Sequence, residues 1–213
     1  LHLAPDYEMT ESLIQSGCVA IAYETVSDDR NGLPLLAPMS EVAGRMAVQA
    51  GAHCLEMHQG GSGTLRGGDP GVTPGKIVII GGGVAGANAA IIGTGMCAQV
   101  SIIEKSTRRM GELDNQFSRL LTTHYATNDI IEQMVVDADL VIGAVLVPGA
   151  AAPKLVSKAM ISAMKLGSVV VDIAIDQGGC FETSRPTTHA EPTYVVDDVV
   201  HYCVANIPAA VAK

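Results

Sequence analysis

Short apolar runs alternate with longer mixed segments through the sequence from residue 76 onward. Ile77–Ile80 and Val169–Val171 are wholly apolar and β-branched, whereas several segments between such runs have the composition of amphipathic helices. The predicted strands are residues 76–80, 99–104, 120–125, 139–145 and 168–173, and the predicted helices include residues 127–136 and 153–165. Nearly continuous apolar strands that alternate with helices are typical of a parallel sheet covered on both faces. The pattern therefore predicts an α/β fold.

The first 75 residues are less regular. Residues 6–17 have the spacing of a short helix ended by a glycine, and residues 19–25 are predicted to form a strand. Residues 40–56 predict one long helix that leads into the glycine-rich segment 60–75. We place the start of the sheet domain within or near this long helix.

Three glycines follow the first predicted strand of the sheet with the spacing Gly81-x-Gly83-x-x-Gly86 and open a helix-compatible segment. In such a turn the first glycine permits a tight bend, the second lets the backbone approach a pyrophosphate, and the third lets the helix pack closely on the strand. The helix start would present N–H groups and the positive end of its dipole to the phosphates. The motif predicts a Rossmann-type dinucleotide-binding domain with a doubly wound parallel sheet.

An acid stands where a ribose contact is expected. Glu104 ends the next predicted strand, 18 residues beyond Gly86. Dinucleotide-binding units use an acid at about this distance to bind the 2′-hydroxyl of the adenosine ribose, and such an acid repels a 2′-phosphate. We therefore expect NAD rather than NADP as the cofactor, although Lys105, Arg108 and Arg109 follow at once. The alternative is a surface glutamate at a strand end.

A membrane span competes for the same region, because Ile77–Ala98 holds 22 residues without a charge. Three consecutive glycines, with β-branched residues before them and alanine-rich sequence after them, fit a strand, a turn and a helix better. We predict neither a membrane span nor a signal peptide.

The composition and charge limit the classes of partner and the cellular compartment that we expect. A net charge of −9 without basic runs argues against nucleic acid. The five cysteines are scattered and lack C-x-x-C spacing, which indicates neither a disulfide framework nor a zinc site. We therefore expect the protein to reside in the reducing cytoplasm. The sequence does not begin with methionine, and we expect it to be a piece of a longer protein.

Asp172 lies within the predicted strand 168–173, and Asp176 follows that strand. Open α/β sheets bind ligands beyond the carboxyl ends of their strands, which makes Asp176 the leading acid–base candidate. Its alternative is a capping or turn aspartate before the next glycine pair. Asp172 lies inside the strand and is expected to be structural. The polar residues 180–189 are predicted to form a functional or interaction loop.

Three histidines are of a residue type that could act in catalysis or bind a metal ion. His2 is a candidate hydrogen-bond donor, although a lone histidine is more often incidental. His53 and His58 are five residues apart and would fall on different faces of one helix, so we predict no metal site there.

Residues 141–149 end in small residues and a Pro-Gly turn, and would form either a dry wall beside a nicotinamide or an ordinary strand-to-loop junction.

Four segments together resemble bacterial L-alanine dehydrogenase, in the alanine dehydrogenase and pyridine nucleotide transhydrogenase family: Leu35–Gly44, Ala138–Ala150, Val171–Glu182 and His201–Pro208. The run from residue 172 to 188 is highly specific, and it separates the chain from the transhydrogenase α subunit. The resemblance implies reversible oxidative deamination of L-alanine to pyruvate and ammonium by NAD. It also implies a homohexamer for the intact parent protein.

Residue roles follow from the resemblance alone. It implies that His2 binds the substrate oxygen and assists proton transfer, and that Asp176 acts in the water and amine steps. Asn206 would lie near the nicotinamide and substrate, and Glu104 would hold the adenosine ribose. The other implied cofactor contacts are Ser40 at the phosphates, Val145 and Leu146 beside the nicotinamide, and Gly81, Gly83, Val84, Ala85, Gly86, Ile173, Asp176 and Val204.

The resemblance begins late in the family's substrate domain. We expect residues 1–38 to be a remnant of that domain, residues 39–58 a linking helix, and residues 59–213 the NAD-binding domain. The family's N-terminal arginine and lysine that grip the substrate, and its C-terminal helical segment, have no counterpart in this sequence. Because charged groups of this kind contribute several kcal/mol, this chain alone is expected to bind NAD and turn over poorly or not at all. The alternative is an NAD(H)-binding module without catalysis, like the transhydrogenase α subunit.

Overall fold

The computed structural model describes residue 3 and residues 6–29, 32–147 and 150–211. Within these residues seven strands form one sheet in the order β3-β2-β1-β4-β5-β7-β6. The strands are β1 Lys76–Ile80, β2 Gln99–Glu104, β3 Leu121–Tyr125, β4 Leu140–Gly143, β5 Val169–Asp172, β6 Thr193–Val196 and β7 Val199–Tyr202. Every neighbouring pair is parallel except β6 and β7. The predicted α/β fold with a doubly wound parallel sheet is confirmed.

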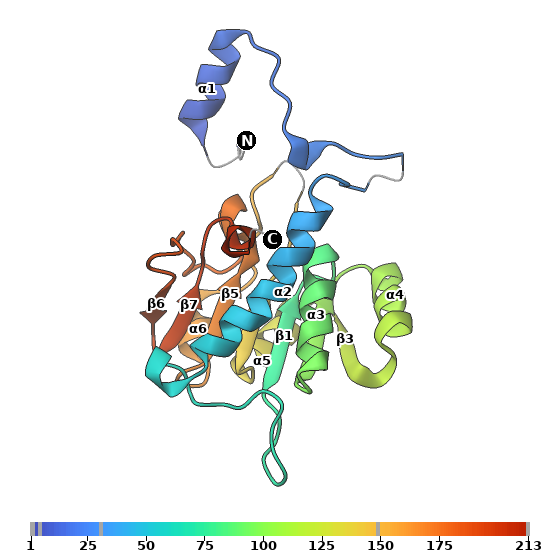
Figure 1. Cartoon of the computed structure of the whole chain (residues 1–213), viewed down its shortest axis with the longest axis vertical. Helices are drawn as coiled ribbons and strands as arrows, with labels where there is room; N and C mark the ends of the chain where they lie inside the picture. Colours follow the sequence, from blue (N-terminus) through green and yellow to red (C-terminus); the bar gives the residue numbers. More distant parts are fainter. Residues whose placement is uncertain (1–2, 4–5, 30–31, 148–149, 212–213) are drawn as a thin grey trace.

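Helices cover both faces of this sheet (Figure 1). The α-helices are α1 Tyr7–Ser16, α2 Ala37–Cys54, α3 Val84–Gly95, α4 Thr107–Phe117, α5 Asn128–Val136 and α6 Lys158–Ser162. Short 3-10 helices are η1 Tyr23–Thr25, η2 Met57–Gln59, η3 Ser118–Leu120, η4 Ile173–Gln177 and η5 Ile207–Ala210.

Alternate residues of the central strand feed two cores. Ile77 and Ile79 point to the face covered by α2, α3 and α4, where they join one buried cluster. Val78 and Ile80 point to the face covered by α5 and α6 and join the other. In a strand buried on both faces every side chain enters a core, which explains why the run 77–80 is apolar throughout.

Small residues bring α2 and α3 into close contact. A Cβ atom on Gly44 of α2 would lie 2.0 Å from the carbonyl oxygen of Ala85, near the start of α3. Alanine side chains such as Ala47 and Ala89 fill the rest of this interface and are fully buried. The beginning of α2 is thereby fixed beside the turn that follows β1.

Several elements differ from their predictions or were not predicted. Helix α6 is shorter than the predicted helix 153–165, because Ser157 caps its start and Val156 before it forms a strand-like bridge to Phe181. Helix α4 and the hairpin of β6 and β7 were not predicted. The hairpin turn has Asp197 and Asp198 at positive φ, as a type I′ turn requires, and aspartate is one of the residues that tolerate this conformation.

The N-terminal segment lies away from the sheet (Figure 1). Helix α1 ends at Gly17 as predicted, with φ of 64°, and contains no buried residue. The predicted strand 19–25 is wrong: this stretch is irregular and then forms η1. Val19 and Ile21 favour a strand by residue type but are 90% and 78% exposed, since no neighbouring strand pairs with them.

The uncharged stretch 77–98 is divided among β1, the glycine turn, α3 and the residues that follow it. Among the described residues, no helix is long and apolar enough to cross a membrane. The five cysteines, all of them described, are free thiols.

Candidate functional site

A cavity of about 420 Å³ opens at the carboxyl ends of β1, β4 and β5. Chain order reverses between β1 and β4, and open α/β sheets bind ligands at such a switch point. Seven of the predicted site residues contribute to its lining: Ser40, Ala85, Val145, Leu146, Ile173, Asp176 and Asn206. The walls are mainly apolar with a few polar groups, as in small-molecule sites of this size.

The glycine turn between β1 and α3 borders this cavity. Gly81 has φ of 101°, and a Cβ there would lie 2.7 Å from the carbonyl oxygen of Ala144. A Cβ on Gly86 would lie 1.9 Å from the carbonyl oxygen of Gly81. Both positions therefore require glycine for the fold itself.

Gly83 differs from the other two. It caps α3 without a side chain, and a Cβ there would meet no protein atom within 4 Å. Space is therefore open beside Gly83 at the start of the helix, whose first residues are Val84 and Ala85. An open helix N-terminus with its dipole directed outward suits a phosphate group.

Glu104 connects the end of β2 to this turn. One carboxylate oxygen accepts a hydrogen bond from the N–H of Gly82 at 2.8 Å, and the other accepts from Lys105 and Ser106 at 2.8 and 2.9 Å. Each oxygen of a carboxylate has two lone pairs, and three of the four are used, so the oxygen bonded to Gly82 retains one for a ribose hydroxyl.

The basic residues after Glu104 have partners of their own. Arg109 donates from Nε to the carbonyl oxygen of Gly82 at 2.7 Å and from Nη1 to Glu112 at 2.9 Å. Arg108 also pairs with Glu112, at 3.2 Å. A 2′-phosphate would have to compete with Glu112 for both guanidinium groups.

Asp176 and Asn206 meet at the cavity from positions 30 residues apart. Asp176 lies on η4 directly after β5, and its two carboxylate oxygens lie 3.3 and 3.4 Å from the backbone nitrogen of Asn206. Asn206 adopts a left-handed conformation with φ of 55° at the start of η5. This bend aims its N–H back at η4 and places acid and amide at one wall.

Asp172 holds η4 in position. Its side chain is fully buried and accepts hydrogen bonds from the N–H groups of Ala174 and Cys180 and from the hydroxyl of Ser184. Burial raises the pKa of this carboxyl, and the hydrogen bonds from Ser184, Cys180, Phe181 and Ala174 oppose the rise. This arrangement bears out the expectation that Asp172 is structural.

The loop 180–189 is tied into the same end of the sheet. Thr183 lies 2.7 Å from Nε2 of His201, and the guanidinium of Arg185 lies 4.1 Å from the ring centre of Tyr194. Burial raises the pKa of the Tyr194 phenol and lowers that of the His201 imidazole. Thr183 and Arg185 of the loop therefore contact strands β7 and β6 and hold the loop against the sheet.

Other predicted positions lie outside the cavity lining. Gly81, Gly83, Val84 and Gly86 form the adjacent turn and helix start, with Glu104 beside them. The Val204 side chain is fully buried in the core, so its contact with a cofactor would be made by its main chain. His2 lies outside the described residues.

Several lining residues were not anticipated. Gln177, next to Asp176, lines the cavity, and its backbone carbonyl oxygen accepts a hydrogen bond from the N–H of Ala152 at 2.8 Å. Glu24 and Thr25 reach the cavity from η1. Proximity to Asp176 could have identified Gln177, whereas no sequence signal links residues 24 and 25 to this site.

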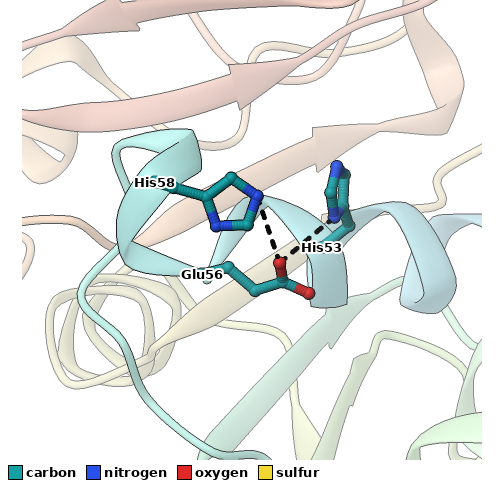
Figure 2. A group of neighbouring side chains, drawn as sticks. All are labelled: His53, Glu56 and His58. Atoms are coloured by element: carbon teal, nitrogen blue, oxygen red, sulfur yellow. Dashed lines mark ion pairs between the residues drawn. The ribbon is translucent and has the colours of Figure 1, made fainter.

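The expectation that His53 and His58 lie apart is wrong. Helix α2 ends at Cys54, so His58 is carried by η2 after the chain has turned. The two ring centres lie 5.9 Å apart, with Glu56 between the rings (Figure 2). Different helix faces would separate the two rings only if one helix continued through residue 58.

Comparison with known proteins places the chain among relatives. The model of the alanine dehydrogenase/PNT C-terminal domain matches residues 47–213, and that of the N-terminal domain matches residues 1–43. The chain belongs to the alanine dehydrogenase/PNT family. It is 60% identical to the alanine dehydrogenase of Halomonas elongata and 55% identical to that of Mycobacterium tuberculosis strain H37Rv, over the whole chain in both cases. It spans 57% of the length of each.

Solved structures of the family give the same picture. A structure of L-alanine dehydrogenase superposes with a TM-score of 0.90 at 52% identity, covering 99% of this chain and 58% of that one. A transhydrogenase from Sinorhizobium meliloti gives a TM-score of 0.80 at 23% identity, covering 100% of this chain and 61% of that one, and shares the fold. The higher identity places the chain on the alanine dehydrogenase side of the family.

Proposed function

We propose that the protein carrying this chain is an NAD-dependent L-alanine dehydrogenase, which deaminates L-alanine oxidatively to pyruvate and ammonium and also catalyses the reverse reaction. The observation that carries this proposal is the open helix start at Gly83 beside a cavity that also contains Asp176. A dinucleotide bound at the first would extend into the second. Relatives at 53–60% identity that are named alanine dehydrogenase supply the reaction type.

The chain's residues fit a dinucleotide. The open space at Gly83 and the start of α3 would receive the pyrophosphate, with Ser40 of α2 as a further contact. Glu104 would accept hydrogen bonds from the adenosine ribose. A carboxylate at that place repels a 2′-phosphate, and therefore the proposed cofactor is NAD.

The cavity residues would set up the chemistry. When bound, NAD accepts a hydride from the substrate at C4 of its nicotinamide. Val145, Leu146 and Ile173 form an apolar wall that would exclude water beside this ring. Asp176 would exchange protons in the water and amine steps, with Asn206 beside it. His2 is proposed to bond the substrate oxygen.

The proposal extends to organisation and assembly. Residues 1–38 would be the end of a substrate domain, residues 39–58 a linking helix, and residues 59–213 the NAD-binding domain. We propose small-molecule substrates, a cytoplasmic location and a homohexamer for the intact protein. In this proposal the chain alone binds NAD and turns over poorly, because the groups that grip the substrate carboxylate lie elsewhere in the protein.

The test uses this chain and the full-length protein at matched concentrations. NADH binding is measured by the increase in nicotinamide fluorescence, and turnover by NADH oxidation with pyruvate and ammonium. We expect binding by both and rapid turnover by the full-length protein. A folded full-length protein that binds NADH without oxidising it would overturn the dehydrogenase assignment. A failure of both proteins to bind NADH would overturn the nucleotide site.

A further inference from the structure

A cluster of three metal-ligating side chains lies outside the nucleotide site. His53 in the last turn of α2, Glu56 after the helix, and His58 on η2 converge as Figure 2 shows. Nδ1 of His53 and Nε2 of His58 each lie 3.5 Å from the same oxygen of Glu56. The three ligand atoms lie within 4.8 Å of one another, and all three residues are exposed.

The spacing suits a metal ion better than direct hydrogen bonds. Charge-assisted N–H···O bonds are about 2.7–2.9 Å long, shorter than the 3.5 Å found here. Tetrahedral zinc with bonds of about 2.0–2.2 Å holds neighbouring ligand atoms about 3.3–3.6 Å apart. Both histidine–carboxylate distances fall in that range. The exposed side chains have the freedom to bring the two imidazoles to the same separation.

The surroundings favour a cation on two counts. The cluster follows the carboxyl end of α2, where the helix dipole is negative. Two neutral imidazoles and one carboxylate leave a net negative charge to meet a divalent ion. Burial lowers the pKa of the Arg66 guanidinium, and the nearby Glu56 charge opposes that shift. Arg66 is therefore a cation that competes with a metal ion for the Glu56 carboxylate.

We propose that His53, Glu56 and His58 form a binding site for a divalent transition metal ion of the zinc type, with water in the remaining position. Imidazole and carboxylate are ligands that zinc accepts, and three protein ligands leave one position open. From Ser40 to His53, α2 rises about 20 Å, so the metal site is remote from the nucleotide cavity. The ion would join the end of α2 to η2 and the loop that follows.

The test measures metal binding by the tag-free full-length protein after removal of metals with a chelator. We expect Zn²⁺ to bind by calorimetry at one site per chain, and Co²⁺ at that site to give the visible absorption of a four- or five-coordinate ion. His53→Ala, His58→Ala and Glu56→Gln should each weaken Zn²⁺ binding by at least about tenfold, because each removes a ligand or its charge.

The matched controls are His124→Ala on β3 and Glu132→Gln on α5, which remove the same residue types elsewhere. Both should bind Zn²⁺ as the parent does. Circular dichroism and NADH binding verify that each variant is folded. Absence of saturable Zn²⁺ binding, or equal losses in the ligand and control variants, would overturn the proposal.

Discussion

The carboxylate of Glu104 accepts a hydrogen bond from the backbone N–H of Gly82 at 2.8 Å. The acid at the end of β2 is therefore fixed to the turn that follows β1, although 22 residues separate the two in sequence. The proposed ribose and pyrophosphate contacts are thus joined by a direct hydrogen bond. This relationship makes the nucleotide site testable by single substitutions.

Glu104→Gln should weaken NADH binding by about tenfold to a hundredfold. The amide oxygen can still accept from Gly82, but the amide nitrogen cannot accept from Lys105 and Ser106, and the charged acceptor for the ribose is lost. Hydrogen bonds to charged groups contribute about 1.5–3 kcal/mol. The measurement is a fluorescence titration with NADH and with NADPH. The ratio of the two affinities should shift toward NADPH, because the charge that repels the 2′-phosphate is gone. Glu132→Gln on α5 is the control, and an unchanged NADH affinity in Glu104→Gln would refute the ribose contact.

Gly83→Ala should separate binding from stability. Its Cβ meets no protein atom within 4 Å, so the free energy of unfolding should fall by about 1 kcal/mol or less. The same methyl would stand where a pyrophosphate approaches, and we expect the NADH dissociation constant to rise at least about tenfold. Chemical denaturation and NADH titration give the two quantities.

Gly95→Ala is the matched control for that substitution. Gly95 ends α3, and its Cβ would also meet no atom within 4 Å. NADH affinity should be unchanged there. Equal affinities in the Gly83 and Gly95 variants would show that the turn does not hold the pyrophosphate.

Asp176→Asn in the full-length protein should lower kcat by about a hundredfold or more, since general acid–base groups contribute about 10²–10⁴-fold. The amide retains an oxygen that can accept from the N–H of Asn206, so the wall of the cavity should persist. The measurement is kcat for NADH oxidation with pyruvate and ammonium, beside the NADH dissociation constant. Wild-type kcat in a folded variant would remove Asp176 from the mechanism.

His201 should make the fold sensitive to mild acid. Its ring is buried between Thr183 and the carbonyl oxygen of Val199, and burial lowers its pKa. The unfolded chain then takes up a proton near pH 6.5 while the folded chain resists it. The contribution of His201 to stability is fully present above the unfolded-state pKa and is lost as the pH falls toward the lower folded-state pKa.

The measurement for His201 is the free energy of unfolding from denaturant titrations at pH 7.5 and 5.5. His201→Gln should be less stable than the parent at pH 7.5, because it alters two buried hydrogen bonds. It should lose less stability than the parent between the two pH values. Parallel declines in the two proteins would assign the acid sensitivity to other groups.

The sequence by itself determined the sheet strands around the nucleotide turn. Strand β2 was predicted with the bounds that the structure has, and β1 is the apolar run that was expected before Gly81. Apolar β-branched runs, and glycines whose missing Cβ atoms the fold requires, are local features that act over a few residues. The same locality explains why helix α1 and its end at Gly17 were predicted.

Only the tertiary structure decided which distant residues meet. It placed Asn206 against Asp176, bound Arg109 to Gly82, left residues 19–25 without a strand partner, and turned His58 back toward His53. Each outcome depends on where the chain returns after a turn or crosses the sheet, and on which side chains fill the space there. Periodicity along the sequence does not encode those returns, because the free energy that selects them comes from packing between elements far apart in the chain.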